Sequence, residues 1–221
     1  TKLEFQDDDI YQVISRYVEI DGTPYVMELV KKMDEENLLD ADGRKKLVSQ
    51  LSGYSDVLYK DALTEAYNRR YFEDELKLQV ESMAVAMFDM DDFKLCNDTY
   101  GHNAGDAALC TMVKIIRKYI RKTDLLVRYG GDEFLLLMKD VTEEVFDEKL
   151  NQIQKKINES SVPGYPNLHL SVSIGGLISS NESLERAVDR ADHLMYQAKN
   201  CKNMVVTETT PLTAVMDSRT Y

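Results

Sequence analysis

Apolar and polar residues alternate in blocks along most of the chain, and the block lengths are those of strands and helices. Short apolar runs of strand length lie at residues 83–88, 125–129, 134–138, 168–174 and, more weakly, 204–207. Longer segments with helical character lie at residues 104–122, 142–160 and 183–200, with Thr142 and Ser183 as candidate N-caps. The order βαββαβ predicts an α/β (α+β) fold, namely a ferredoxin-like or polymerase-palm sheet with helices on one face.

The N-terminal part of the chain has a different pattern. In residues 11–31, two runs of β-branched and aromatic residues flank Asp21-Gly22, which predicts a β-hairpin. A lone hairpin is only marginally stable in water. We therefore expect residues 1–33 to be the C-terminal end of a sensor domain, similar to the last strands of a PAS-like module; alternatively, the hairpin packs on its own helix.

Residues 34–60 are polar and helical in pattern. Leu47, Leu51, Tyr54 and Leu58 recur at spacings of 4, 3 and 4, which is an a/d stripe. The pattern favours a helical stalk in a parallel dimer, and the alternative is a single amphipathic helix packed on its own domain. We expect the main folded domain to occupy residues 61–207 and a flexible tail to occupy residues 208–221.

Composition narrows the possible functions. The 221 residues carry a net charge of −12 at pH 7, which disfavours general binding to nucleic acid but does not exclude a nucleotide substrate. Three cysteines without a C-x-x-C pair indicate neither a disulfide framework nor a zinc site, and we expect a reducing, cytoplasmic location. No apolar run reaches the roughly 18 residues that a membrane-spanning helix needs.

Acidic residues stand at the ends of two predicted strands. Asp89 follows the buried run at residues 83–88, and Asp132-Glu133 follow Gly130-Gly131 in the turn of a predicted hairpin. In a palm-like sheet these two points meet, and carboxylates on rigid strand ends suit magnesium with bound phosphates. The glycines permit a tight turn and close approach of the backbone to a ligand. The alternative is a surface turn with solvated acids.

Five segments in order resemble the GGDEF family. The segment from Asp89 to Asp106 fills every fixed position of D-x-D-x-F-K-x-x-N-D-x-x-G-H-x-x-G-D. The others are DALTEAYNRRYF at 61–72, which departs from the family pattern at Glu65 and Ala66, RYGGDEF at 128–134, SVSIGG at 171–176 and ADHLMYQAK at 191–199. The resemblance covers about residues 61–207 and implies a diguanylate cyclase, which condenses two GTP molecules into cyclic di-GMP in bacterial second-messenger signalling.

The resemblance implies a role for each matching residue. Asp89, the Met90 carbonyl, Asp132 and Glu133 would hold Mg²⁺ (Mn²⁺ is an alternative), with two ions per GTP. Asp132 would also take the proton from the attacking ribose 3′-hydroxyl. Lys94 would neutralise charge at the α-phosphorus, as a second catalytic residue. The residues expected to contact substrate are Phe93, Lys94, Asn97, His102, Asp106, Gly130, Gly131 and Lys199.

Two of these residues would read the base. Asn97 and Asp106 would hydrogen-bond guanine, and a carboxylate can accept from N1–H and the 2-amino group in a way that adenine does not allow. Outside the resemblance, Asn97 would be a turn or helix cap and Asp106 the cap of a helix starting near Ala107. Lys94 would then be a surface lysine.

The segment after Lys199 departs from the family pattern of two residues followed by Gly-Arg-Asn. Either Cys201 replaces the glycine after a one-residue deletion and Lys202 takes the arginine position, or Lys202 replaces the glycine without a deletion and Asn203 takes the arginine position.

Arg121 and Asp124 form an R-x-x-D pattern shortly before the GGDEF motif. The resemblance implies an inhibitory site for cyclic di-GMP, for which the planar fork of arginine is suited. The alternative is an arginine at a helix C-terminus followed by a turn.

The family mechanism requires a homodimer, because each domain binds one GTP and the two must face each other. A GGDEF module that has lost catalysis and only senses GTP or cyclic di-GMP is the main alternative from another functional class.

Overall fold

The computed structural model describes residues 2–6, 9–20, 23–33 and 56–210. The chain divides into two compact units, residues 1–57 and 58–221. In the part of the chain that is described, no helix is long and apolar enough to span a bilayer.

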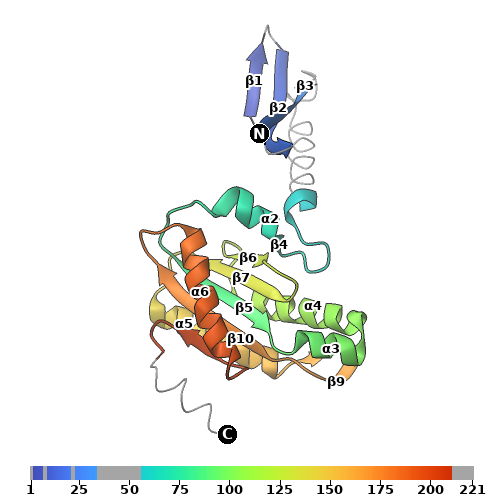
Figure 1. Cartoon of the computed structure of the whole chain (residues 1–221), viewed down its shortest axis with the longest axis vertical. Helices are drawn as coiled ribbons and strands as arrows, with labels where there is room; N and C mark the ends of the chain where they lie inside the picture. The colour runs from blue at the N-terminus through green and yellow to red at the C-terminus, as the bar shows by residue number, and fades with distance from the viewer. Residues whose placement is uncertain (1, 7–8, 21–22, 34–55, 211–221) are drawn as a thin grey trace. The chain divides into compact units, whose positions relative to one another are not determined.

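The N-terminal unit contains an antiparallel sheet of three strands in the order β1-β2-β3 (Figure 1). These are β1 (Lys2–Gln6), β2 (Asp9–Ile20) and β3 (Thr23–Met33). Pairing of Ile20 with Thr23 confirms the predicted hairpin, whose turn residues 21–22 lie outside the described part. The sequence analysis missed β1, because a five-residue alternation of polar and apolar residues is a weak signal. The expected stalk lies outside the described residues except at its end, where residues 56–59 are helical.

The C-terminal unit is built on a sheet of six strands in the order β11-β10-β5-β7-β6-β4. Its central strands are β5 (Met83–Met90), β6 (Leu125–Arg128), β7 (Glu133–Met138) and β10 (Val172–Ser179). These four pair antiparallel in the order β10-β5-β7-β6, which is the ferredoxin-like order, so the predicted fold class is confirmed. Two short parallel strands, β4 (Tyr67–Asn68) and β11 (Val205–Thr207), extend the two edges.

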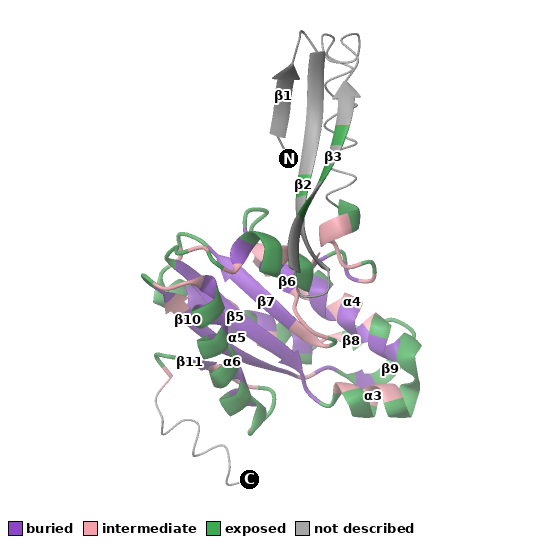
Figure 2. Ribbon diagram, turned by 45° about the horizontal axis from the view of Figure 1, so that its top comes forward, coloured by how far each residue is buried: buried purple, intermediate pink, exposed green. Residues whose placement is uncertain are grey.

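Helices cover both faces of this sheet, so the prediction of helices on one face was wrong. On one side, Ala86 and Phe88 of β5 pack in a core with α4 (His102–Tyr119) and α5 (Glu143–Asn158). On the other side, Val85 and Met87 pack with α6 (Leu184–Lys199) and the π-helical segment η2 (Phe72–Leu76). All eight residues of β5 are consequently buried (Figure 2). A continuous apolar run is typical of a strand that is buried on both faces.

Several element boundaries differ from the prediction. The expected strand at residues 168–174 is in fact the end of β9 (Tyr165–His169), which pairs with β8 (Ser161–Val162), followed by the start of β10. Helix α3 (Phe93–Tyr100) was not predicted, because it is short and its apolar residues are interrupted by polar ones. The Thr142 cap is confirmed by its bond from the Val145 amide, whereas Ser183 stands at the N-cap position without a capping side-chain bond.

Gly175 on β10 lets α6 lie directly on the sheet. A Cβ at this position would stand 2.0 Å from the Met195 amide nitrogen and 2.3 Å from the Ala191 carbonyl oxygen, both in the α6 backbone. A larger residue would force the helix away from the strand. This close approach fixes the end of α6, where Lys199 is located.

Candidate functional site

The predicted metal-binding acids come together at one end of the central strands. Asp89 of β5 and Glu133 of β7 are direct cross-strand partners. The Met90 amide donates to the Asp132 carbonyl over 3.3 Å, which brings the turn before β7 against the end of β5. Antiparallel pairing therefore joins residues that lie more than forty positions apart in the sequence.

Asp89 has an unusual environment for a carboxylate. Its side chain is only 4% exposed, and Oδ2 accepts a 2.7 Å hydrogen bond from Lys199 Nζ. Its Oδ1 is buried and has no hydrogen-bond partner among the described residues. Burial raises the pKa of Asp89 to about 6; Lys199 opposes the rise, and the charges of Asp132 and Glu133 add to it. The pKa of Glu133 is raised as well, by burial and then by Asp132 and Asp192.

These observations fit a divalent cation. A buried carboxylate oxygen without a partner and a group of acids with raised pKa values both indicate negative charge that the protein itself does not neutralise. Hard oxygen donors suit Mg²⁺ or Mn²⁺. Among the described residues, no three side chains of aspartate, glutamate, histidine or cysteine are grouped closely enough to hold a metal ion by themselves. The Met90 carbonyl and substrate phosphates would have to supply part of the coordination.

Asp91, which the sequence analysis did not single out, ties three segments of the site together. Its buried carboxylate accepts from the hydroxyls of Ser171 and Ser173 and from the Asn203 amide. The carboxylate thus connects the end of β5 to the start of β10 and to the loop after α6. Its two sequence signals were its fixed place in the D-x-D motif and the alternation of Ser171 and Ser173.

The backbone of the loop after Lys199 favours the alternative without a deletion. Lys202 has a φ of 57° and Asn203 one of 49°, whereas Cys201 is not in the left-handed region. Because that region favours glycine, the backbone places the glycine position of the family at Lys202. Lys202 also donates to both oxygens of Asp92 over 2.7 and 2.8 Å.

The residues expected to read the base gather around Gly105. A Cβ on Gly105 would stand 2.1 Å from Asn97 Oδ1 and 3.2 Å from Phe93 Cε2, so the absence of a side chain there makes room for both residues. Asn97 Oδ1 is buried without a described hydrogen-bond partner. Asp106 follows Gly105 and is exposed within α4. The alternative in which Asp106 caps this helix is wrong, because α4 begins four residues earlier.

Lys94 and His102 are both exposed on the same pair of helices, α3 and α4. The ammonium group of Lys94 forms no ion pair with any described residue, so it is available to an anionic ligand. Their expected contacts with substrate stay predictions.

Arg128 holds the Gly130-Gly131 turn in place. Its guanidinium donates to the Gly131 carbonyl over 2.7 and 3.1 Å and to both oxygens of Asp61 over 3.1 Å. Burial raises the pKa of Asp61, but the bonds from Thr64 and the bond and charge of Arg128 outweigh burial, so the pKa is lowered. Asp61 and Arg128 each begin one of the family-like motifs, and that position is the sequence signal for their role.

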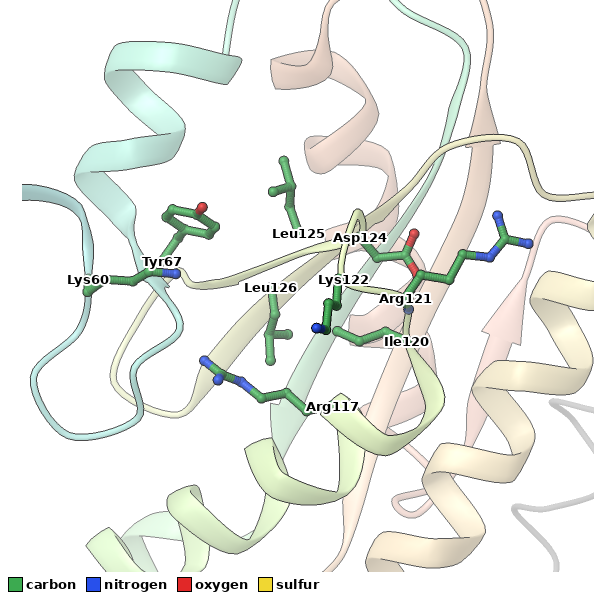
Figure 3. A pocket seen from close by; sticks show the side chains of 9 residues that line it. All are labelled: Lys60, Tyr67, Arg117, Ile120, Arg121, Lys122, Asp124, Leu125 and Leu126. Atoms are coloured by element: carbon green, nitrogen blue, oxygen red, sulfur yellow. Dashed lines mark hydrogen bonds between the residues drawn. The ribbon is translucent and has the colours of Figure 1, made fainter. Parts of the chain in front are cut away.

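Arg121 and Asp124 lie in the turn between α4 and β6. Asp124 Oδ2 accepts from the Arg121 amide over 2.7 Å, and the carboxylate is buried. One oxygen of Asp124 therefore stabilises the turn itself. The Arg121 side chain is exposed and extends from the turn (Figure 3).

The fold and the site define a class of protein, a ferredoxin-like α/β domain with a group of carboxylates at the ends of its central strands. Within that class, the chain belongs to the GGDEF family, because the family model described as "Diguanylate cyclase, GGDEF domain" matches residues 58–204.

Curated relatives agree with this assignment. The chain is 33% identical over 175 residues to "Probable diguanylate cyclase DgcT" of Escherichia coli, covering 72% of this chain and 38% of the relative. It is 38% identical over 130 residues to "Diguanylate cyclase A" of Treponema denticola, covering 57% of this chain and 35% of the relative. The chain thus spans less than half the length of these relatives.

Solved structures also match. The coiled coil and GGDEF domain of DgcB from Caulobacter crescentus, in complex with c-di-GMP, has a TM-score of 0.68 at 25% identity, covering 78% of this chain and 98% of that one. Diguanylate cyclase SiaD from Pseudomonas aeruginosa, in complex with its activator SiaC, has a TM-score of 0.66 at 28% identity, covering 76% and 68%.

Proposed function

We propose that this chain is a diguanylate cyclase that condenses two GTP molecules into cyclic di-GMP and releases two pyrophosphates. The observation that carries the proposal is the cross-strand pair Asp89 and Glu133, with one Asp89 oxygen buried and unpartnered. In a purely structural role, burial of this unpartnered oxygen would cost free energy of folding and would have no explanation.

The metal ligands would be Asp89, the Met90 carbonyl, Asp132 and Glu133. When bound, Mg²⁺ or Mn²⁺, two ions per GTP, would supply positive charge to the triphosphate and acidify the attacking hydroxyl. Asp132 would accept the proton of the ribose 3′-hydroxyl. Lys94 would lie beside the α-phosphate, and Lys199 would contact the phosphates further along the triphosphate.

Guanine would be recognised beside Gly105. The unpartnered Oδ1 of Asn97 would accept from the base, and Asp106 would accept from N1–H and the 2-amino group. Adenine presents an acceptor at N1, so a site built to accept a hydrogen bond there would be left unpaired. Phe93, His102, Gly130 and Gly131 would complete the contacts with substrate.

Turnover would require a homodimer, since each domain holds one GTP and the two half-sites must face each other around a two-fold axis. Residues 1–33 would belong to a sensor domain and residues 34–60 to a stalk that sets how the two domains of residues 61–207 meet. Residues 208–221 would be a flexible tail. Cyclic di-GMP would inhibit by binding at Arg121 and Asp124, and a cytoplasmic location would supply GTP.

The test is Mg²⁺-dependent conversion of GTP by the full chain, with products resolved by mass and pyrophosphate release measured in parallel. We expect cyclic di-GMP from the parent and from Glu143→Ala, an exposed acid at the start of α5, and none from Asp132→Ala. The same assay with ATP should give no cyclic product.

Tight binding of GTP or cyclic di-GMP without turnover at any protein concentration would contradict the enzyme and favour the sensor. The series must include high protein concentration, because a dimer-dependent enzyme loses activity on dilution.

A further inference from the structure

Two lysines near the C-terminal end of α6 contact the end of β5 and the turn that follows it. Lys199 donates to Asp89 over 2.7 Å, and Lys202, three residues later, donates to both oxygens of Asp92 over 2.7 and 2.8 Å. The Met90 carbonyl, a proposed metal ligand, lies between these two acids in the chain. Lys202 therefore lies at the edge of the candidate metal site.

The contact between Asp92 and Lys202 joins two residues with unfavourable backbone conformations. Their φ angles are 55° and 57°, and Asn203 follows with a φ of 49°. Three of the six non-glycine residues with positive φ in the described part of the chain thus lie at or next to this contact. Backbone strain of this kind persists only where the surrounding structure holds it, and it is concentrated at ligand-binding sites.

The ion pair by itself does not account for this strain. The side chains of Lys202 and Asp92 are 56% and 52% exposed, and an exposed ion pair contributes little to stability. Asp92 also stands at the N-cap position of α3 without making a side-chain capping bond. Glycine at position 202 would relieve the strain and would lose only this weak pair. The lysine side chain is therefore better explained by a ligand that it binds.

The loop that carries Lys202 is fixed on its other side. The Asn203 amide donates to Asp91 over 2.8 Å, and Gln154 of α5 donates to the backbone and side-chain oxygens of Asn203 over 2.8 and 2.6 Å. The side chain of Asn203 is thereby held against α5. Between Lys199 and the end of the described residues, Lys202 is the one lysine or arginine, so it is the only cationic side chain that this loop offers to an anion.

An anionic substrate at this end of the sheet needs cationic partners. Asp89, Asp91 and Asp92 lie within four consecutive positions, and a nucleoside triphosphate brings further negative charge. Lysine binds phosphate as a point charge. An exposed ammonium group on a flexible stem can exchange one anionic partner for another at little cost. Lys202 can thus leave Asp92 for a phosphate group.

We propose that Lys202 binds the triphosphate of the substrate and that Asp92 competes with the substrate for Lys202. The inference rests on the proposed function and deepens it, because it names a pair of residues that sets the affinity for the phosphate chain. Without ligand, Asp92 holds the ammonium group. With a nucleoside triphosphate, the ammonium group moves to the phosphates and Asp92 is released to water. A nucleoside monophosphate, which lacks the rest of the phosphate chain, gains little from Lys202.

The experiment is equilibrium binding of 3′-deoxy-GTP to the full chain with Mg²⁺, measured by calorimetry, and of GMP, measured by competition. Neither nucleotide can condense with itself, since the first lacks the attacking hydroxyl and the second lacks a pyrophosphate leaving group. We expect Lys202→Gln to weaken binding of 3′-deoxy-GTP about tenfold, as for a lost charge-assisted contact. Asp92→Asn, which keeps a residue that tolerates the left-handed backbone, should strengthen that binding about threefold. The affinity for GMP should stay within about twofold in both variants.

A double variant separates competition from long-range electrostatics. When Asp92→Asn is combined with Lys202→Gln, the gain from Asp92→Asn should disappear, because no lysine remains to be released. A gain that persists would show that Asp92 merely repels the nucleotide, which overturns the competition.

Lys156→Gln is the matched control, because Lys156 forms an exposed 2.7 Å pair with Glu159 at the C-terminal end of α5. It should leave both affinities within about twofold of the parent. An equal loss of 3′-deoxy-GTP binding in Lys156→Gln and Lys202→Gln would overturn the proposal, as would an equal loss for 3′-deoxy-GTP and GMP in Lys202→Gln. Thermal unfolding of each variant checks that it is folded.

Failure of this inference and failure of the proposed function give different results. A parent that makes cyclic di-GMP, together with a Lys202→Gln chain that binds 3′-deoxy-GTP as tightly as the parent, overturns the inference and leaves the function. A parent that binds 3′-deoxy-GTP but makes no cyclic di-GMP overturns the function, and the effects of Lys202→Gln and Asp92→Asn still decide the inference. A parent that does not bind 3′-deoxy-GTP overturns both.

Discussion

Lys199 Nζ lies 2.7 Å from Asp89 Oδ2, so the last residue of α6 pairs with the carboxylate near the end of β5, 110 positions earlier in the chain. The pKa of Lys199 is raised: burial lowers it, but the bond to Asp89 and the charges of Asp132 and Asp91 outweigh that effect. The pair links the packing of α6 on Gly175 to the charge balance of the candidate metal site.

Lys199→Met should therefore destabilise the metal-free chain by about 1 kcal/mol, since it leaves a buried carboxylate unpaired while the lysine head is partly solvated. Lys139→Met is the matched control, because Lys139 pairs with Glu81 on the surface, and it should change stability by less than about 0.5 kcal/mol. Urea unfolding at neutral pH measures both. Equal effects of the two substitutions would contradict a special role for Lys199.

Asp89→Asn should stabilise the chain in chelator, and the gain should depend on pH. The pKa of Asp89 is about 6 in the folded state against 3.8 for the free side chain, so the folded state holds the proton more tightly. The contribution of Asp89 to the free energy of unfolding of the parent is therefore greatest below pH 3.8 and is lost as the pH rises to about 6. The difference in melting temperature between Asp89→Asn and parent should grow between about pH 3.8 and about pH 6 and then level off. A difference that is flat across this window would refute the raised pKa.

Gly130→Ala and Gly131→Ala should separate metal binding from folding. A Cβ on Gly130 would stand 2.3 Å from Glu133 Oε2, whereas a Cβ on Gly131 would meet nothing within 4 Å. Only Gly130→Ala should displace the Glu133 carboxylate and weaken Mn²⁺ binding, by about tenfold as for lost supporting contacts in metal sites. Both variants should keep their stability within about 1 kcal/mol, because a flexible side chain can move aside. Mn²⁺ titration followed by electron paramagnetic resonance gives the affinities, and equal affinities would contradict the geometry.

Asp61 and Arg128 should be energetically coupled. Their side chains are about one-fifth exposed and share two 3.1 Å contacts, and Arg128 also holds the Gly131 carbonyl. A double-mutant cycle with Asp61→Asn and Arg128→Gln should give a coupling free energy of about 1 kcal/mol. Additive effects on unfolding would show that the pair does not hold the turn.

Asp91→Ala should cost about 2–4 kcal/mol of stability, because three donors would lose a buried charged acceptor. Asp91→Asn should cost less, since one oxygen remains to accept. Asp98→Ala, an exposed acid of α3, should change stability by less than about 0.5 kcal/mol. Urea unfolding distinguishes these outcomes, and an Asp91→Ala chain as stable as the Asp98 control would overturn the role of Asp91 as a link.

Much of the fold followed from periodicity in the sequence. The apolar run at residues 83–88 and the runs on either side of Gly130-Gly131 predicted the central strands, because strand-length apolar segments between turn residues have few other solutions. The apolar run at residues 83–88 could not reveal whether the strand is buried on one face or on both. That depends on where α6 packs, and the packing at Gly175 involves an α6 residue twenty positions later in the chain. Helix α3 and the break at Leu170-Ser171 were missed because their local patterns are short and mix apolar with polar residues.

For the site, the sequence by itself determined which residues are the candidates for the chemistry, since motif spacing places Asp89, Asp132 and Glu133 at strand ends. Only the tertiary structure decided their electrostatic state. The raised pKa of Asp89, the unpartnered oxygens of Asp89 and Asn97 and the acceptor role of Asp91 all arise from burial and from neighbours distant in the chain. A local sequence pattern contains no record of such long-range contacts.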